Sequence, residues 1–278
     1  MSLCSFLEDS PDVREYLRDT FPKPDTPRPK NLLAPPLTKN YQTIGTAFDY
    51  YLRWYLQHLN RRTSSSGTWV AEQALASIVS VRSKRLAAAS VIRARHRVRI
   101  ATASGRFGTA LAESAIEMAR LDPVYRVGLG EDLIGRRVSP RDVADLRRLL
   151  AIIPKNRFSS GVCFLNPVFN AANLVMGADA DFILGDTLIE LKVTVDPKVW
   201  RDYFNQLLGY YFLHRIGGIC GARRQPKIRR LGIYMARFGY LATWSLTEIA
   251  SERALANATT WFRRRALKQW PRISGDTA

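Results

Sequence analysis

Hydrophobic residues in the first half of the chain recur at helical spacing. Between residues 41 and 60 an apolar side chain returns every three or four positions, which is typical of one buried helix face. The residues on that face are Phe48, Tyr51, Leu52, Tyr55, Leu56 and Leu59. Further helices are predicted over residues 1–20, 68–90, 106–120 and 139–153. The polar, serine-rich stretch Arg61–Gly67 predicts a loop between the first two long helices.

After residue 160 the pattern changes to short β-like runs. Strands are predicted over residues 161–165, 181–184, 187–194, 230–236 and 240–246. Asp196-Pro197 predicts the start of a helix over residues 198–215, which Gly217 and Gly218 end. A long final helix fits residues 247–269. This order predicts an α/β fold in which helices flank a central mixed sheet, behind an N-terminal helical region.

Three parts of the chain follow from this layout. Residues 1–40 form an N-terminal segment with a proline-rich basic arm, residues 41–155 a helical region packed on the core, and residues 156–278 the core with its C-terminal helix. Between residues 21 and 40 there are six prolines and four lysines or arginines. Proline at that density excludes a regular helix and favours an extended segment.

The charge of the chain is strongly positive. There are 42 Lys and Arg against 24 Asp and Glu, a formal net charge of +18. Such an excess indicates a polyanionic partner, with DNA expected first and RNA as an alternative. The competing explanation is an arginine-rich composition without functional meaning. A membrane partner is not expected, because no stretch of 18 apolar residues occurs.

The cysteines exclude two kinds of structure. Cys4, Cys163 and Cys220 lie far apart and are odd in number. They therefore predict neither a disulfide framework nor an iron–sulfur cluster. The first ten residues contain Glu8 and Asp9 and no apolar run, so no signal peptide is expected, and a cytoplasmic location is the default expectation.

One predicted hairpin carries candidate chemistry. Gly185-Asp186 is a two-residue loop of the kind that favours a type II′ turn. This turn fixes the register, so that Asp181 faces Glu190 and Asp179 faces Lys192. Side chains alternate along strands, which puts these four polar residues on one face and an apolar set on the other. The apolar set is Phe182, Leu184, Ile189, Leu191 and Val193.

Two carboxylates placed opposite each other are unfavourable unless a cation neutralises them. Mg²⁺ or Mn²⁺ held by Asp181 and Glu190 would do so, and Lys192 would add a positive charge beside a phosphate. The competing interpretation is a solvated Glu-x-Lys strand face, with Asp179 as the salt-bridge partner of Lys192. In the helix that follows, Gln206 and Tyr210 are four residues apart and share a face. That pair fits either phosphate binding or a buried tyrosine satisfied by the glutamine.

Taken together, Asp181, Glu190-Leu-Lys192 and Gln206-x-x-x-Tyr210 resemble the PD-(D/E)XK nuclease superfamily, most closely its RecB-like branch. The resemblance covers residues 175–215 well. It implies a restriction-endonuclease-like core, with Asp181 and Glu190 as ligands of Mg²⁺ or Mn²⁺. It also implies that Lys192 acts on the attacking water and that Gln206 and Tyr210 support the site.

The resemblance is incomplete upstream of the hairpin. RecB-like members carry Gly-x-x-x-His on an earlier helix, and the matching stretch here is Gly45-Thr-Ala-Phe-Asp49, with Asp in place of His. Asp49 is therefore an additional candidate ligand, and Asp179 is another. Some related nucleases have four cysteines for an iron–sulfur cluster, which this chain lacks.

The sequence thus predicts a metal-dependent deoxyribonuclease acting in DNA repair, recombination or antiviral defence against foreign DNA. A non-catalytic nucleic-acid-binding subunit on the same fold is the alternative. A helicase or another protein partner is a further expectation, because the nuclease core is small and a partner would direct it to its substrate. Backbone-binding residues are expected at Arg223, Arg224, Arg229, Arg230 and Arg237, with further basic clusters at 82–99 and 263–268.

Overall fold

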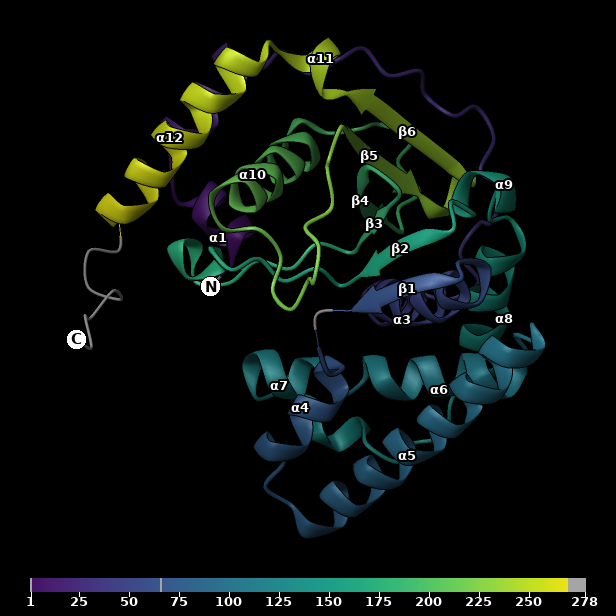
Figure 1. Ribbon diagram of the computed structural model, residues 1–278. Coiled ribbons are helices and arrows are strands. Elements are labelled where there is room, and N and C mark those ends of the chain that lie inside the picture. The colour runs from purple at the N-terminus through teal and green to yellow at the C-terminus, as the bar shows by residue number, and fades with distance from the viewer. Residues whose placement is uncertain (1, 66, 270–278) are drawn as a thin grey trace.

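A computed structural model describes residues 2–65 and 67–269 of the chain. Its centre is a mixed six-stranded sheet in which spatial order follows sequence order (Figure 1). The strands are β1 (Arg62–Ser65), β2 (Val162–Leu165), β3 (Phe182–Leu184), β4 (Thr187–Lys192), β5 (Arg230–Met235) and β6 (Tyr240–Ser245). The β1–β2 and β4–β5 pairs are parallel and the others antiparallel. The predicted α/β class with a mixed sheet flanked by helices is therefore confirmed.

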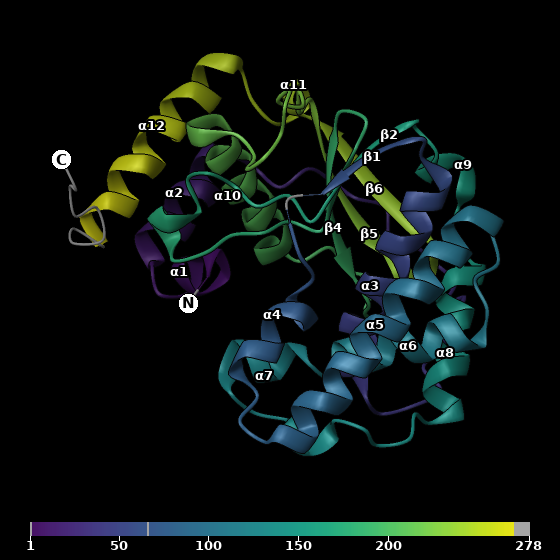
Figure 2. The same cartoon turned by 60° about the horizontal axis from the view of Figure 1, so that its bottom comes forward.

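Long helices cover both faces of the sheet (Figures 1 and 2). The hydrophobic core on one face includes residues of α3 (Tyr41–Leu59), α6 (Thr109–Ala119), α8 (Pro140–Ala151) and α5 (Val81–Ser104), which packs on α3 and α6. The other face packs on α1 (Leu3–Glu8), α2 (Pro11–Thr20), α10 (Arg201–Gly217) and α12 (Glu252–Gln269). Each face of the sheet thus has its own hydrophobic core, and the hairpin β3–β4 contributes side chains to both.

Short helices make the connections. They are α4 (Val70–Ser77), α7 (Asp122–Val127), η1 (Glu131–Leu133), α9 (Lys155–Phe158), η2 (Ala172–Val175), η3 (Ala236–Phe238) and α11 (Leu246–Ile249). The single helices predicted over residues 68–90, 247–269 and 1–20 were wrong in this respect, because each is divided into two. The first divides before Val81, where the Ser80 side chain accepts a hydrogen bond from the backbone nitrogen of Ser83 and starts a new helix.

The loop predicted at Arg61–Gly67 was also wrong, because Arg62–Ser65 forms β1. This strand lies at the edge of the sheet and pairs in parallel with β2. Its side chains are mostly exposed, so it lacks the alternating hydrophobic residues by which a strand is recognised. Only its long-range pairing with Val162–Leu165 makes it a strand.

The hairpin register near the turn is as predicted. Leu184 pairs with Thr187, and Phe182 pairs with Ile189. Gly185 has φ +61°, the left-handed region that such a turn requires. Beyond Phe182 the chain leaves β4, because the Ala180 backbone nitrogen donates to Pro167 instead.

The proline-rich segment has no helix or strand over residues 22–40, as predicted. It does not extend freely along its whole length, because Ala34 is fully buried and its backbone nitrogen donates to the Arg237 carbonyl at 2.9 Å. Within the described residues, no helix is long and apolar enough to cross a membrane.

Candidate active site

Three of the predicted acidic residues line one cavity of about 530 Å³. Asp181 and Glu190 reach it from the hairpin, and Asp49 reaches it from α3. Gly45, one turn before Asp49, also lines the cavity. The structure therefore brings together residues that are more than 130 positions apart in the sequence. Asp49 was an uncertain candidate by its sequence alone, and its position next to the hairpin carboxylates strengthens it.

Asp181 is held by the backbone of the neighbouring strand. Its Oδ2 atom accepts a hydrogen bond from the Leu191 backbone nitrogen at 2.5 Å. Burial raises the pKa of Asp181, while this hydrogen bond and the charges of Lys192 and Arg53 act in the opposite direction. The carboxylate is thus fixed in orientation and carries a perturbed pKa.

Glu190 is a buried carboxylate with a raised pKa. It is 6% exposed, and its Oε2 atom receives no hydrogen bond from any residue that the structure describes. Burial, and then the charge of Asp181, raise the pKa of Glu190 to about 8. A buried carboxylate with an unpartnered oxygen beside a second carboxylate is a favourable place for a cation.

A hydrogen-bonded chain connects Glu190 with the helix behind the hairpin. The Lys192 Nζ atom donates to Glu190 Oε1 at 2.9 Å and to Gln206 Oε1 at 3.0 Å. The Gln206 amide then donates to the Tyr210 hydroxyl at 2.9 Å. Burial and the charge of Glu190 raise the pKa of Tyr210 well above its ordinary value, so this phenol stays neutral.

Lys192 remains a cation in this setting. Burial lowers its pKa, but the charge and hydrogen bond of Glu190 outweigh that effect and the net pKa is raised. The ammonium also lies 4.7 Å from the centre of the Tyr203 ring. Lys192 and Gln206 line a second cavity of about 520 Å³, together with Cys4 from α1. Glu190 and Asp181 line the first cavity and Lys192 lines the second, so the Lys192–Glu190 ion pair connects the two.

Asp179 does not occupy its predicted place opposite Lys192. It pairs with Val168 in an isolated bridge, because the chain before Phe182 follows the loop at Pro167 and Val168 rather than β4. Its carboxylate is 41% exposed and lies 4.0 Å from Arg126 Nη2. The alternative that Asp179 is the salt-bridge partner of Lys192 is wrong for the same reason.

Three residues near the carboxylates were not singled out from the sequence. Arg53, four residues after Asp49, forms an ion pair with it. Asp122, at the start of α7, lines the cavity and accepts a hydrogen bond from the Tyr50 hydroxyl at 2.8 Å. Arg126 on α7 also lines the cavity. The i,i+4 spacing of Asp49 and Arg53 was a usable signal, whereas an Asp-Pro sequence at Asp122 indicates only a helix start.

Four of the five proposed backbone-binding arginines lie on the surface. Arg223, Arg224, Arg229 and Arg230 are exposed. The backbone nitrogens of Arg229 and Arg230 donate to the Asp186 carbonyl, so this loop lies against the hairpin turn. At about 3.3 Å per strand residue, the turn is roughly 13 Å along β4 from Glu190.

The assignment of Arg237 to nucleic-acid binding was wrong. Its side chain is 1% exposed and pairs with Asp145 on α8, which is fully buried. The two Nη–Oδ distances are 2.9 and 3.1 Å, and Nη1 also donates to the Ala34 carbonyl at 3.0 Å. All three contacts are internal, so Arg237 ties the core to the N-terminal segment and cannot reach a phosphate.

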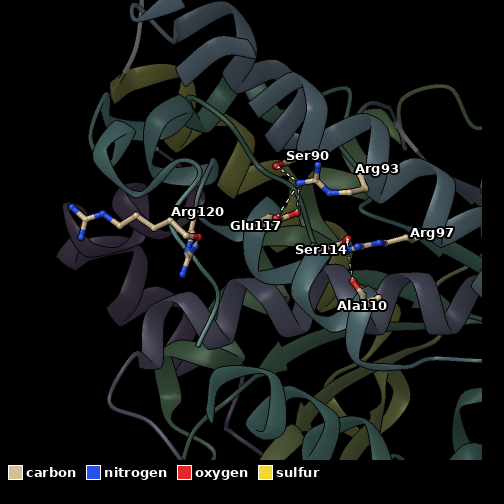
Figure 3. Close-up of polar contacts among 8 residues, drawn as sticks. Ser90, Arg93, Arg97, Ala110, Ser114, Glu117 and Arg120 are labelled. Atoms are coloured by element: carbon tan, nitrogen blue, oxygen red, sulfur yellow. Dashed lines mark hydrogen bonds and ion pairs between the residues drawn. The ribbon is translucent and has the colours of Figure 1, made fainter. Parts of the chain in front are cut away.

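The basic cluster on α5 is partly used inside the protein. Figure 3 shows Arg93 and Arg97 directed at α6, where Arg93 Nη2 lies 3.1 Å from Glu117 and Arg97 Nη1 lies 2.7 Å from the Ala110 carbonyl. Arg95 pairs with Glu72 on α4. By contrast, Arg99 is exposed and its guanidinium has no ion-pair partner in the described part of the chain.

The carboxylates fit a hard divalent cation, although they do not form a complete protein cage. Among the described residues, no three His, Cys, Asp or Glu side chains are arranged as a metal-binding group. Mg²⁺ commonly uses only one or two carboxylates and takes its remaining ligands from water and substrate phosphate. Glu190 Oε2 and Asp49 Oδ1 are buried and without hydrogen-bond partners in the described structure.

Comparison of the chain with models of protein families, with curated proteins and with solved structures found no match.

Proposed function

We propose that this protein is a metal-dependent nuclease that hydrolyses phosphodiester bonds in DNA. The observation that carries the proposal is the arrangement around Glu190. This buried carboxylate lines a cavity together with a second carboxylate, Asp181; one of its oxygens accepts a hydrogen bond from the Lys192 ammonium, and the other has no hydrogen-bond partner in the described structure. Phosphodiester hydrolysis needs these components: anionic ligands for a metal ion, a fixed positive charge and a cavity open to the substrate.

In this proposal Asp181 and Glu190 hold Mg²⁺ or Mn²⁺, and Asp49 is a third oxygen donor. When bound, the cation supplies Lewis-acid stabilisation of the phosphate charge. Lys192 adds a fixed positive charge near the reacting phosphate and keeps its proton, because its pKa is raised. Gln206 holds Lys192 through its carbonyl oxygen, and Tyr210 holds Gln206 in turn.

The order of elements adds support. The helix α3 and the strand β1 are followed by the helices α4 to α9, then by the strands β2, β3 and β4, the helix α10 and the strand β5, and β5 lies parallel to β4. This order fits the restriction-endonuclease-like core implied by the sequence resemblance. The net charge of +18 and the exposed arginines at 223–230 fit a nucleic-acid partner.

The test is cleavage of linear and circular DNA in EDTA, Mg²⁺ and Mn²⁺ by the unmodified protein and by Glu190→Ala and Lys192→Ala. We expect metal-dependent cutting that both substitutions abolish while the fold stays intact. The linear and circular substrates separate an enzyme that needs ends from one that cuts internally. DNA binding without any cutting in these conditions would favour a non-catalytic binding subunit instead. Replacing DNA with RNA of the same sequence determines which nucleic acid is cut.

A further inference from the structure

The candidate cavity continues into two further cavities. Arg126 lines both the cavity of Asp181 and Glu190 and a cavity of about 690 Å³. Asn166 lines that second cavity and also a third of about 660 Å³. Neighbouring cavities in this series thus share lining residues, and we treat the three together as one groove. We call it the α4–α7 groove, because helices α4 and α7, which pack side by side, form one of its walls (Figures 1 and 2).

The middle of the groove has surfaces suited to nucleobases. Tyr125 on α7 is 47% exposed and lines this part. Met176 follows η2 on the side of the sheet, lines the same cavity and is 37% exposed. Aromatic rings stack on bases of any sequence, and a thioether offers a polarizable contact. The exposed Tyr125 ring is therefore available to stack on a flat ligand.

The far end of the groove is polar and basic. Arg99 on α5 lines it and has no ion-pair partner in the described residues, whereas Arg95, which also lines it, is paired with Glu72 and lies 4.5 Å from the Trp69 ring centre. Thr63 and Ser64 on the edge strand β1 also line this cavity. Arginines and hydroxyl groups are the usual partners of phosphate oxygens. The groove thus alternates between surfaces for bases and surfaces for phosphates.

We propose that the α4–α7 groove binds an unpaired strand of nucleic acid that leaves the candidate active site. This inference rests on the proposed function for the position of the cut. A base within a duplex is stacked between its neighbours, so Tyr125 stacks only on bases that are unpaired. Glu190, 6% exposed at one end of this path, is likewise reached by a strand that enters the cavity rather than by a duplex lying across the surface.

The test is a binding measurement in EDTA, so that it does not depend on cleavage. The anisotropy of a labelled oligothymidylate is compared with that of a blunt duplex of the same length. We expect tighter binding of the single strand. Tyr125→Ala weakens that binding about tenfold, whereas Tyr125→Phe, which keeps the ring, binds like the unmodified protein. Equal affinity of Tyr125→Ala and the unmodified protein for the single strand overturns the proposal.

A second pair of variants tests the basic end. Arg99→Gln removes a charge in the groove, and Arg141→Gln removes an exposed charge at the start of α8, outside all three cavities. We expect Arg99→Gln to reduce the salt dependence of single-strand binding by about one released ion, and Arg141→Gln to leave it unchanged. An equal effect of the two variants overturns the proposal.

The two proposals fail separately. If cleavage depends on Glu190 but the groove variants bind normally, the groove is not the strand path and the nuclease proposal stands. If the groove variants lose binding but no cleavage depends on Glu190, the groove is a binding site and the nuclease proposal falls.

Discussion

The ammonium of Lys192 lies 2.9 Å from Oε1 of Glu190, while the other oxygen of this carboxylate is buried without a hydrogen-bond donor in the described structure. The two oxygens of Glu190 thus face different tasks. One accepts a hydrogen bond from the lysine, and the other is the oxygen that we propose as a ligand of the cation. The contribution of Lys192 and the contribution of the proposed cation can therefore be measured separately.

Lys192→Met removes the ammonium and keeps most of the side-chain volume. We expect DNA cleavage to fall by about 100-fold or more, because a fixed positive charge near the phosphate is lost. Binding of Mn²⁺ should persist, because the substitution removes a positive charge beside the cation rather than a ligand. Glu190→Gln should lose both. Cleavage assays and calorimetric titration with Mn²⁺ measure the two properties, and loss of Mn²⁺ binding in Lys192→Met would mean that the lysine merely holds Glu190 in place.

The raised pKa of Glu190 predicts a specific pH dependence of stability. Folded Glu190 keeps its proton up to a pKa of about 8, whereas the unfolded chain releases it near 4.5. The folded state therefore binds more protons between these values, and stability decreases as pH rises through this window. Glu190→Gln has no such proton, so its melting temperature should fall less between pH 4.5 and about 8. The melting temperatures are measured in EDTA across this pH range. An equal fall of the melting temperature in both proteins would contradict this account.

The parts of the site that follow local rules were predictable from the sequence. The Gly185-Asp186 turn fixed three residue pairs of the hairpin, and helical spacing placed Gln206 and Tyr210 on one face. The predicted pairing failed at Asp179, which pairs with Val168 and not with a residue of β4. The register of a hairpin can be extended from its turn only as far as the two strands stay paired.

The remaining features depend on residues far apart in the sequence. Arg237 follows a strand and precedes a turn, as a surface arginine would, and its burial depends on Asp145, 92 residues earlier. The strand β1 likewise exists only through β2, 100 residues later. Asp122 and Arg126 reach the candidate site because α7 lies against it, which no spacing in the sequence indicates.

Asp49→Asn tests whether this residue is a ligand or only the partner of Arg53. If Asp49 contributes an oxygen donor, the substitution should weaken Mn²⁺ binding by about tenfold or more. Arg53→Gln removes the partner of the ion pair but not the carboxylate, so it should preserve Mn²⁺ binding better than Asp49→Asn does. Calorimetric titration of both variants gives the comparison. Equal losses would mean that the ion pair matters and that Asp49 is not a ligand.

Asp145→Ala tests whether the buried Arg237–Asp145 ion pair stabilises the fold. The substitution leaves the guanidinium buried without its carboxylate, which should lower the free energy of unfolding by about 3–5 kcal/mol. The matched control is Asp132→Ala, which breaks the Asp132–Arg136 pair, whose side chains are 67% and 61% exposed. An exposed pair of this kind contributes at most about 1 kcal/mol.

Urea unfolding of both variants provides the measurement. A double replacement of Asp145 by Leu and Arg237 by Met should recover much of the lost stability, because neither charge then remains buried. The same double variant also tests whether Arg237 binds DNA, because it lacks the guanidinium. We expect it to bind DNA like the unmodified protein, since the Arg237 side chain is 1% exposed. Weaker DNA binding by a stably folded double variant would return Arg237 to the nucleic-acid interface.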